Sequence, residues 1–152
     1  MRVALAQINA TVGDIAGNEA KILAAYAQGV AAGVDLVIAP ELALTGYPPK
    51  DLALNEAFVS QNLAALERLA GKTGKTALVT GFIGRNEIRP GRKATNAIAL
   101  LQHGKIQAVR TKTLLPTYDV FDEDRYFEPA TENAPVDCAG TKLGLTICED
   151  LW

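Results

Sequence analysis

Residues 34–41 read VDLVIAPE, and this short stretch determines how the rest of the chain is interpreted. Its apolar part, 34–39, has the length and composition of a strand that is buried on both faces. Pro40 cannot continue a central strand, so the strand is expected to end there, with Glu41 directly after it. Strands of this kind belong to sheets covered by helices, which makes an α/β fold the first expectation.

Helical and strand patterns alternate on either side of this stretch. Residues 2–8 alternate like a strand, Asn18 is a good N-cap for a helix that ends near Ala32, and a second helix is expected over about 55–72. Residues 113–135 are expected to form a long loop. Further strands are expected at 76–83, 94–101, 105–110 and 141–147. This order predicts an α/β domain in which helices pack on one face of a mixed sheet.

The composition is that of a globular chain with little net charge. Its 152 residues are 49% hydrophobic, with 15 basic and 17 acidic side chains and a net charge of −2. This balance excludes intrinsic disorder, and it provides no basic tract with which to hold nucleic acid. No apolar run approaches the ~20 residues that cross a bilayer, so no membrane partner is expected.

The cysteines and the histidine restrict the possible chemistry. Cys138 and Cys148 are too few for a disulfide framework, and they fit a reducing compartment. The first residues carry no secretory signal pattern, so a cytoplasmic location is expected. His103 is the single histidine, which leaves too few ligands for a Cys/His zinc site, and no metal site is predicted.

Three polar residues follow expected strands, at positions where loops on a rigid scaffold often carry function. Glu41 follows the first buried strand, and a shielded carboxylate there suits a general base. Lys112 follows the strand at 105–110, where an ammonium group in a closed pocket can stabilise an oxyanion. Cys148 leaves the strand at 141–147 into a turn that can expose its sulfur as a nucleophile. Taken singly, each has an ordinary alternative: a solvated glutamate, a surface lysine and a small buried hydrophobe.

The sequence around these three residues is more specific than their positions. It contains PELALTGYPP at 40–49, KTLLPTYDVFDEDRYF at 112–127 and ICEDLW at 147–152. Together these motifs resemble the nitrilase/amidase superfamily, whose members use a Glu-Lys-Cys triad in this chain order. Within that superfamily they look like the N-terminal glutaminase domains of glutamine-dependent NAD⁺ synthetases, and the resemblance covers the whole chain.

The resemblance implies a catalytic role for each member of the triad. Cys148 would attack the side-chain carboxamide of glutamine, and Glu41 would accept the thiol proton and later pass a proton to the leaving ammonia. Lys112, together with a backbone N–H just after Cys148, would stabilise the tetrahedral oxyanion. A glutamyl thioester would form and then be hydrolysed to glutamate.

Three more residues receive roles from the same resemblance. Glu123 matches the second glutamate of the superfamily in its F-x-E motif, and it would orient Lys112 or the substrate. Tyr47 and Tyr118 fall where the family places tyrosines of the substrate pocket, and they would line the glutamine site. The ordinary alternatives are a solvated acid and two aromatic side chains that pack in loops.

The resemblance also implies a larger protein. The superfamily fold is a four-layer αββα sandwich, and residues 1–152 correspond to the N-terminal portion of such a carbon-nitrogen hydrolase domain. Its remainder and an ATP-dependent synthetase domain would lie outside this chain, together with ATP and Mg²⁺. No P-loop occurs within the chain, and no cofactor is expected in this segment. The chain alone is expected to be inactive, and the whole protein to be a homo-oligomer that amidates deamido-NAD with ammonia from glutamine.

Other functions remain open at this point. One alternative is a stand-alone amidase or carbamoylase of the nitrilase family that acts on another small amide. A second is a folded module without catalysis, in which the triad residues are present but not assembled. A nucleotide-binding domain is not favoured, because no G-x-G-x-x-G follows the strand at 2–8.

Overall fold

The computed structural model describes residues 1–88 and 90–152, and it confirms a mixed α/β fold. In chain order the elements are β1 (Val3–Leu5), α1 (Ile15–Ala31), β2 (Leu36–Ile38), the 3-10 helix η1 (Lys50–Leu54), α2 (Glu56–Gly71), β3 (Ala77–Arg85), β4 (Ala94–Gln102), β5 (Lys105–Thr111), the 3-10 helix η2 (Glu123–Arg125), β6 (Val136–Cys138), β7 (Thr141–Leu143) and the 3-10 helix η3 (Cys148–Leu151).

Among the described residues, the main sheet has five strands in the order β1-β2-β3-β4-β5. The first three are parallel, because α1 and α2 each carry the chain back across the sheet between them. The last two are antiparallel to their neighbours. His103 and Gly104 join β4 to β5 with φ angles of 55° and 76°, as a two-residue hairpin turn requires.

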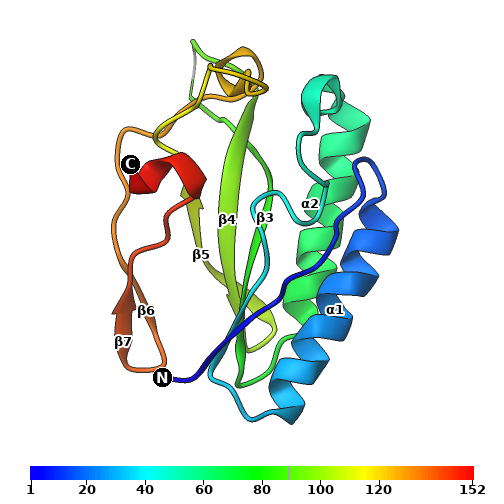
Figure 1. Ribbon diagram of the computed structural model, residues 1–152, viewed down its shortest axis with the longest axis vertical. Coiled ribbons are helices and arrows are strands. Elements are labelled where there is room, and N and C mark those ends of the chain that lie inside the picture. Colours follow the sequence, from blue (N-terminus) through cyan, green and yellow to red (C-terminus); the bar gives the residue numbers. More distant parts are fainter. Residues whose placement is uncertain (89) are drawn as a thin grey trace.

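The main sheet has a different cover on each face. On one face, α1 and α2 contribute Ile22 and Leu69 to a buried cluster that includes Val37 of β2. On the other face, the β6–β7 hairpin and the segment after it pack against the sheet, with Val136 and Leu145 in the second buried cluster. Figure 1 shows the two helices on one side of the sheet and the hairpin on the opposite side. The predicted packing of helices on one face is therefore confirmed.

The first helix begins earlier than the sequence pattern predicted. Asp14 is the N-cap, and its Oδ1 accepts a hydrogen bond from the Gly17 amide at 2.9 Å. Asn18 is instead fully buried in the first turn of α1, where its side chain both donates to and accepts from the backbone of Thr11 at 2.8 Å. Asn18 was predicted as the cap, but it secures the preceding loop. For α2 the predicted start is confirmed, since Asn55 caps it.

The expected strand at 141–147 is only partly formed. β7 ends at Leu143 and pairs with β6, a strand that the sequence pattern did not indicate. Leu145 and Ile147 keep the alternating burial of a strand, but the backbone pairing with a neighbouring strand stops before them. The Leu145 carbonyl accepts from Asn133 Nδ2 at 2.6 Å instead. Apolar residues at every second position thus predict which side chains are buried, whereas a strand also needs a neighbouring strand to pair with.

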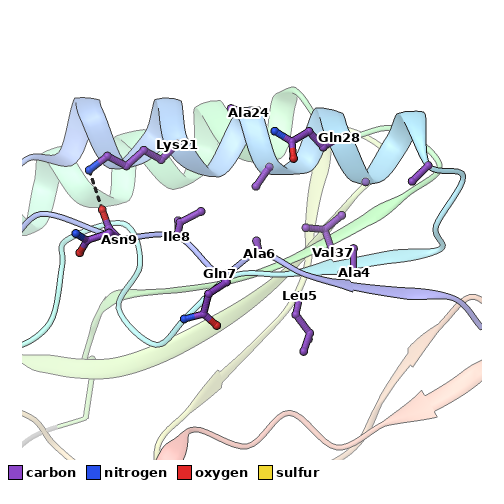
Figure 2. A pocket seen from close by; sticks show the side chains of 13 residues that line it. Ala4, Leu5, Ala6, Gln7, Ile8, Asn9, Lys21, Ala24, Gln28 and Val37 are labelled. Atoms are coloured by element: carbon purple, nitrogen blue, oxygen red, sulfur yellow. Dashed lines mark hydrogen bonds between the residues drawn. The ribbon is translucent and has the colours of Figure 1, made fainter.

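A groove of about 860 Å³ runs between α1 and the chain from β1 to Asn9. Figure 2 shows Ala6 facing the helix, Leu5 pointing away from it, and Lys21 Nζ reaching the Asn9 carbonyl at 2.8 Å. β1 is an edge of the sheet here, and Leu5 is 77% exposed.

In the described part of the chain, no helix is both long and apolar enough to span a membrane.

Candidate active site

Glu41 lies in a tight turn after β2, and this turn packs against β3. The Ala39 amide still pairs with the Val79 carbonyl at 2.8 Å, and the chain then turns through Leu42, whose φ is 46°. Gly81 lies directly under this turn, because a Cβ on it would come within 2.2 Å of the Leu42 nitrogen. The absence of a side chain at Gly81 therefore lets the backbone of β3 approach the turn that holds Glu41.

Lys112 lies at the end of β5, and its side chain is completely buried. Its backbone amide donates to the Asn96 carbonyl at 2.9 Å, which extends the β4–β5 pairing by one residue. Its Nζ lies 2.8 Å from Glu41 Oε1 and 2.9 Å from Glu123 Oε1. Burial lowers the pKa of the ammonium group, but the hydrogen bonds and charges of the two glutamates raise it above its ordinary value. The Lys112 side chain is therefore a buried cation between two carboxylates.

Asn96 is a member of this cluster that sequence reasoning missed. It is buried in the middle of β4, and its Nδ2 donates to Glu41 Oε1 at 2.7 Å and to Glu123 Oε2 at 3.2 Å. The one signal in the sequence was an amide side chain inside a mostly apolar strand. Buried polar groups are normally hydrogen-bonded, so that pattern could have indicated a polar partner but not which one.

Glu123 is brought into the cluster by η2. Its side chain is 5% exposed, and its backbone amide donates to the Pro116 carbonyl at 3.1 Å. The Tyr47 hydroxyl donates to Glu123 Oε1 at 2.8 Å. Burial, followed by the hydrogen bond and charge of Glu123, raises the pKa of Tyr47 far above its ordinary value, so Tyr47 remains a donor. Glu123 is therefore not a solvated acid, and Tyr47 contacts it directly.

Cys148 is the first residue of η3, and its φ of 46° lies in the left-handed region that residues other than glycine seldom adopt. Cys148 and Glu41 both line a cavity of about 190 Å³ between the Glu41 turn, β4 and the segment before η3. Cys148 is exposed to solvent, but partial desolvation of its thiol and the charge of Glu41 raise the pKa of the thiol, and Lys112 offsets part of this rise. The structure thus brings all three triad residues to one place: Lys112 contacts Glu41, and Cys148 shares a cavity wall with Glu41.

Tyr118 lies apart from the buried cluster. It is 56% exposed, its hydroxyl donates to Glu149 Oε2 at 2.9 Å, and its ring meets Phe121 edge to face at 5.5 Å. With Trp152 it lines a separate surface groove of about 400 Å³. Of the two predicted pocket tyrosines, Tyr47 is therefore part of the cluster and Tyr118 stands outside it, beside the residue that follows Cys148.

The acidic side chains of the cluster face a cation that belongs to the chain itself. Glu41 and Glu123 both contact the Lys112 ammonium. Across residues 1–88 and 90–152, the structure contains no group of three or more His, Cys, Asp or Glu side chains placed to hold a metal ion.

Residues 2–152 match the family of carbon-nitrogen hydrolases. The chain belongs to this family. A curated relative, glutamine-dependent NAD(+) synthetase of Synechocystis, is 47% identical over 154 residues; the match covers 99% of this chain and 28% of the relative. This carbon-nitrogen hydrolase therefore spans a little over a quarter of the length of that relative.

Solved structures of other proteins have the same fold. Glutamine-dependent NAD⁺ synthetase from Acinetobacter baumannii, in complex with ADP, matches with a TM-score of 0.90 and 33% identity, over 99% of this chain and 28% of that protein. An amidase from Nesterenkonia matches with a TM-score of 0.83 and 29% identity, over 99% of this chain and 56% of that amidase. A mutant of this amidase shows acrylamide joined by Michael addition to its active-site cysteine.

Proposed function

We propose that this chain supplies the groups with which the intact protein hydrolyses the side-chain amide of glutamine through a thioester on Cys148. The observation that carries the proposal is the buried Lys112 ammonium held between Glu41 and Glu123, with Cys148 on a wall of the cavity that Glu41 lines. A nucleophile, a base and a fixed positive charge are the three groups that acyl transfer from an amide needs. The 47% identity to a synthetase that carries glutamine in its name supports glutamine as the amide.

The first half of the reaction forms the thioester. Glu41 takes the thiol proton as Cys148 Sγ attacks the carboxamide carbon, and the C=O electron pair moves to oxygen. Lys112 stabilises the oxyanion that results. The C–N bond then breaks as Glu41 returns the proton to nitrogen, so that ammonia leaves and a glutamyl thioester remains on Cys148.

The second half of the reaction releases glutamate. Glu41 removes a proton from water as the water oxygen attacks the thioester carbon, and Lys112 again balances the oxyanion. Collapse of this intermediate breaks the C–S bond, and the proton returns to sulfur. The carboxylic acid released passes its proton to ammonia, so the sum is glutamine plus water giving glutamate plus ammonium, and the enzyme is restored.

The electrostatics of the site support Glu41 as the base. Because burial and the charge of Glu41 raise the thiol pKa, Cys148 is protonated at neutral pH, and a group nearby must remove its proton. Glu123 and Lys112 are in contact, so we assign Glu123 the role of orienting the ammonium group. Tyr47 and Tyr118 are proposed to line the glutamine pocket. Tyr47 donates a hydrogen bond to Glu123, and Tyr118 donates one to Glu149, the residue after Cys148.

We extend the proposal to the whole protein as follows. Residues 1–152 form the N-terminal portion of a glutaminase domain, and its ammonia is used elsewhere in the protein for the ATP-dependent amidation of deamido-NAD to NAD. The relatives named as NAD⁺ synthetases, one of them in complex with ADP, support this assignment. A homo-oligomer is proposed because Leu5 is exposed on the open edge of β1. A cytoplasmic location suits a thiol nucleophile, and both cysteines are free.

The proposal is tested by a matched pair of cysteine variants in the intact protein. We expect Cys148→Ala to abolish ammonia release from glutamine, while NAD synthesis from added ammonia continues. Cys138→Ala, which removes the buried second thiol, is expected to keep both activities. Acrylamide should form an adduct at Cys148 that mass spectrometry locates. An adduct only at Cys138, or unchanged ammonia release by Cys148→Ala, would refute the role of Cys148.

A stand-alone amidase is the second candidate, and the similarity to the Nesterenkonia amidase favours it specifically. The two candidates differ in substrate and product use. A glutaminase of the proposed kind prefers glutamine over acetamide and supports NAD synthesis, whereas an amidase hydrolyses small amides without any synthesis. Rates with glutamine, acetamide and deamido-NAD plus ATP, measured on one preparation, separate them.

A further inference from the structure

Asp150 joins the two segments that carry Lys112 and Cys148. Its Oδ1 accepts hydrogen bonds from the Thr113 amide at 2.9 Å, the Thr113 hydroxyl at 2.7 Å and the Leu114 amide at 2.9 Å. Its Oδ2 accepts from the Ile147 amide at 3.0 Å. One carboxylate therefore binds the backbone that follows Lys112 and the backbone that precedes Cys148.

We propose that Asp150 is a positioning residue that fixes Cys148 relative to the Lys112 ammonium. This inference rests on the proposed function, because it assigns Asp150 to the geometry of that same reaction. Asp150 would not contact the reacting atoms. It acts through the two short segments that it holds together, which we call the Asp150 bridge (Asp150 with Thr113, Leu114 and Ile147).

The segments on each side have little regular structure of their own. β5 ends at Thr111, and the chain from Thr113 to Pro116 lies outside any strand or helix. On the other side, β7 ends at Leu143 and η3 is a single short turn. Without ladder hydrogen bonds, these segments depend on side-chain contacts for their position.

The bridge also closes the turn that contains Cys148. The Asp150 amide donates to the Ile147 carbonyl at 3.1 Å, and Asp150 Oδ2 accepts from the Ile147 amide. These two bonds enclose Cys148, whose backbone has a φ of 46°. A residue other than glycine keeps this conformation only when its surroundings enforce it, and the bridge supplies that constraint.

The charge state of Asp150 suits this role. Burial raises the pKa of its carboxyl. The hydrogen bonds from Thr113, Leu114 and Ile147 lower this pKa by more than burial raises it, so the net pKa lies below the ordinary value. Asp150 is then a carboxylate at neutral pH, and an ionised carboxylate can only accept, which matches the donors around it.

The test substitutes Asp150→Asn in the intact protein. Asparagine has the same shape, but its NH₂ group must face at least one N–H that now donates to Asp150. Because a displacement of about 1 Å at a reacting group can cost about 100-fold, we expect kcat for ammonia release to fall between tenfold and 100-fold. KM for glutamine is expected to stay within about twofold, since Asp150 is not assigned to the substrate pocket.

Two further variants calibrate this result. Thr113→Val removes the hydroxyl donor and keeps the amide, so kcat should fall in the same direction by less. Asp137→Asn makes the same chemical change on an exposed aspartate that pairs with Lys142, and it should leave kcat and KM unchanged. All rates are compared per folded molecule, at temperatures well below the thermal midpoint of each variant.

Amide hydrogen exchange gives a readout that does not depend on catalysis. In Asp150→Asn, the amides of Thr113, Leu114 and Ile147 should exchange faster, because each loses or weakens its bond to the carboxylate. Unchanged kcat, or a fall in kcat that only follows the folded fraction, would overturn the role of Asp150. If the unsubstituted protein releases no ammonia from glutamine, the proposed function itself fails, and unchanged exchange in Asp150→Asn would separately overturn the bridge.

Discussion

Asn96 donates its side-chain amide to Glu41 Oε1 at 2.7 Å. The same Nδ2 group lies 3.2 Å from Glu123 Oε2, so one amide contacts both carboxylates that share the Lys112 ammonium. Two carboxylates with one ammonium give a buried cluster with excess negative charge, and Asn96 supplies neutral donors in place of a second cation. Its side chain is therefore part of the charge balance of the site.

We predict that Asn96→Asp destabilises the protein increasingly as pH rises. A third carboxylate in the cluster has its folded-state pKa raised by its acidic neighbours, so it is tolerated when protonated and costly when ionised. At pH 7.5 the loss in free energy of unfolding should be about 3–5 kcal/mol, with a smaller loss at pH 5. Urea unfolding at both pH values measures this. Asn9→Asp, on an exposed residue, is the control, and an equal loss at both pH values would contradict the prediction.

Replacement of Lys112 by methionine should abolish activity and lower the free energy of unfolding. Lys112→Met leaves Glu41 and Glu123 facing one another in a buried site without their cation, which costs about 3–5 kcal/mol at neutral pH. Acidification should reduce this cost, because one carboxyl can then be protonated. Unfolding experiments between pH 5 and 8 follow the trend. Lys105→Met, on an exposed lysine at the start of β5, should change neither property, and wild-type stability of Lys112→Met would argue against the ion pairs.

Substitution of Glu41 should make Cys148 react with iodoacetamide at lower pH, although the same substitution abolishes catalysis. Burial and the charge of Glu41 raise the thiol pKa, so the midpoint of the alkylation rate should lie above the ordinary value of about 8.5. Glu41→Gln removes one cause of the increase and should move the midpoint to lower pH, while ammonia release is lost. Cys138→Ala as the background leaves one thiol to follow. A midpoint that rises in Glu41→Gln would show that the carboxylate acts otherwise.

Gly81→Ala tests the support under the Glu41 turn. The added methyl would lie 2.2 Å from the Leu42 nitrogen, so the turn must move and Glu41 must move with it. We expect kcat to fall at least about tenfold, together with a loss of stability of about 1–3 kcal/mol from overpacking. Gly74→Ala is the matched control, because nothing lies within 4 Å of its added methyl. Equal kinetics in the two variants would mean that the turn adapts without moving the carboxylate.

Much of the architecture could be predicted from local patterns. The buried run at 34–39 and the start of the second helix near residue 55 depend on residues close together in the sequence, and the structure has both. The start of α1 shows where such reasoning fails. Asp14 and Asn18 are both good N-caps, and the choice between them depends on Asn18 being needed by the backbone of Thr11, a contact outside the helix.

The candidate site divides in the same way. The residue types of Glu41, Lys112 and Cys148, together with their motifs, predicted a shared site, and the structure brings them together. Asn96 could not be found by type, because its role depends on facing two glutamates that come from other parts of the chain. A polar side chain in an apolar strand predicts that a partner exists, whereas the identity of the partner is fixed by the fold.

The Lys112–Glu41 ion pair joins residues that are 71 positions apart in the sequence, and this separation affects how the chain folds. The intervening residues include α2 and the strands β3, β4 and β5, in which β3 pairs with β4 and β4 pairs with β5. The ion pair can close only after those elements have assembled, since the entropy of closing a long loop must be offset first. During refolding, secondary structure should therefore recover before the Lys112–Glu41 pair, and hydrolytic activity should be the last property to return.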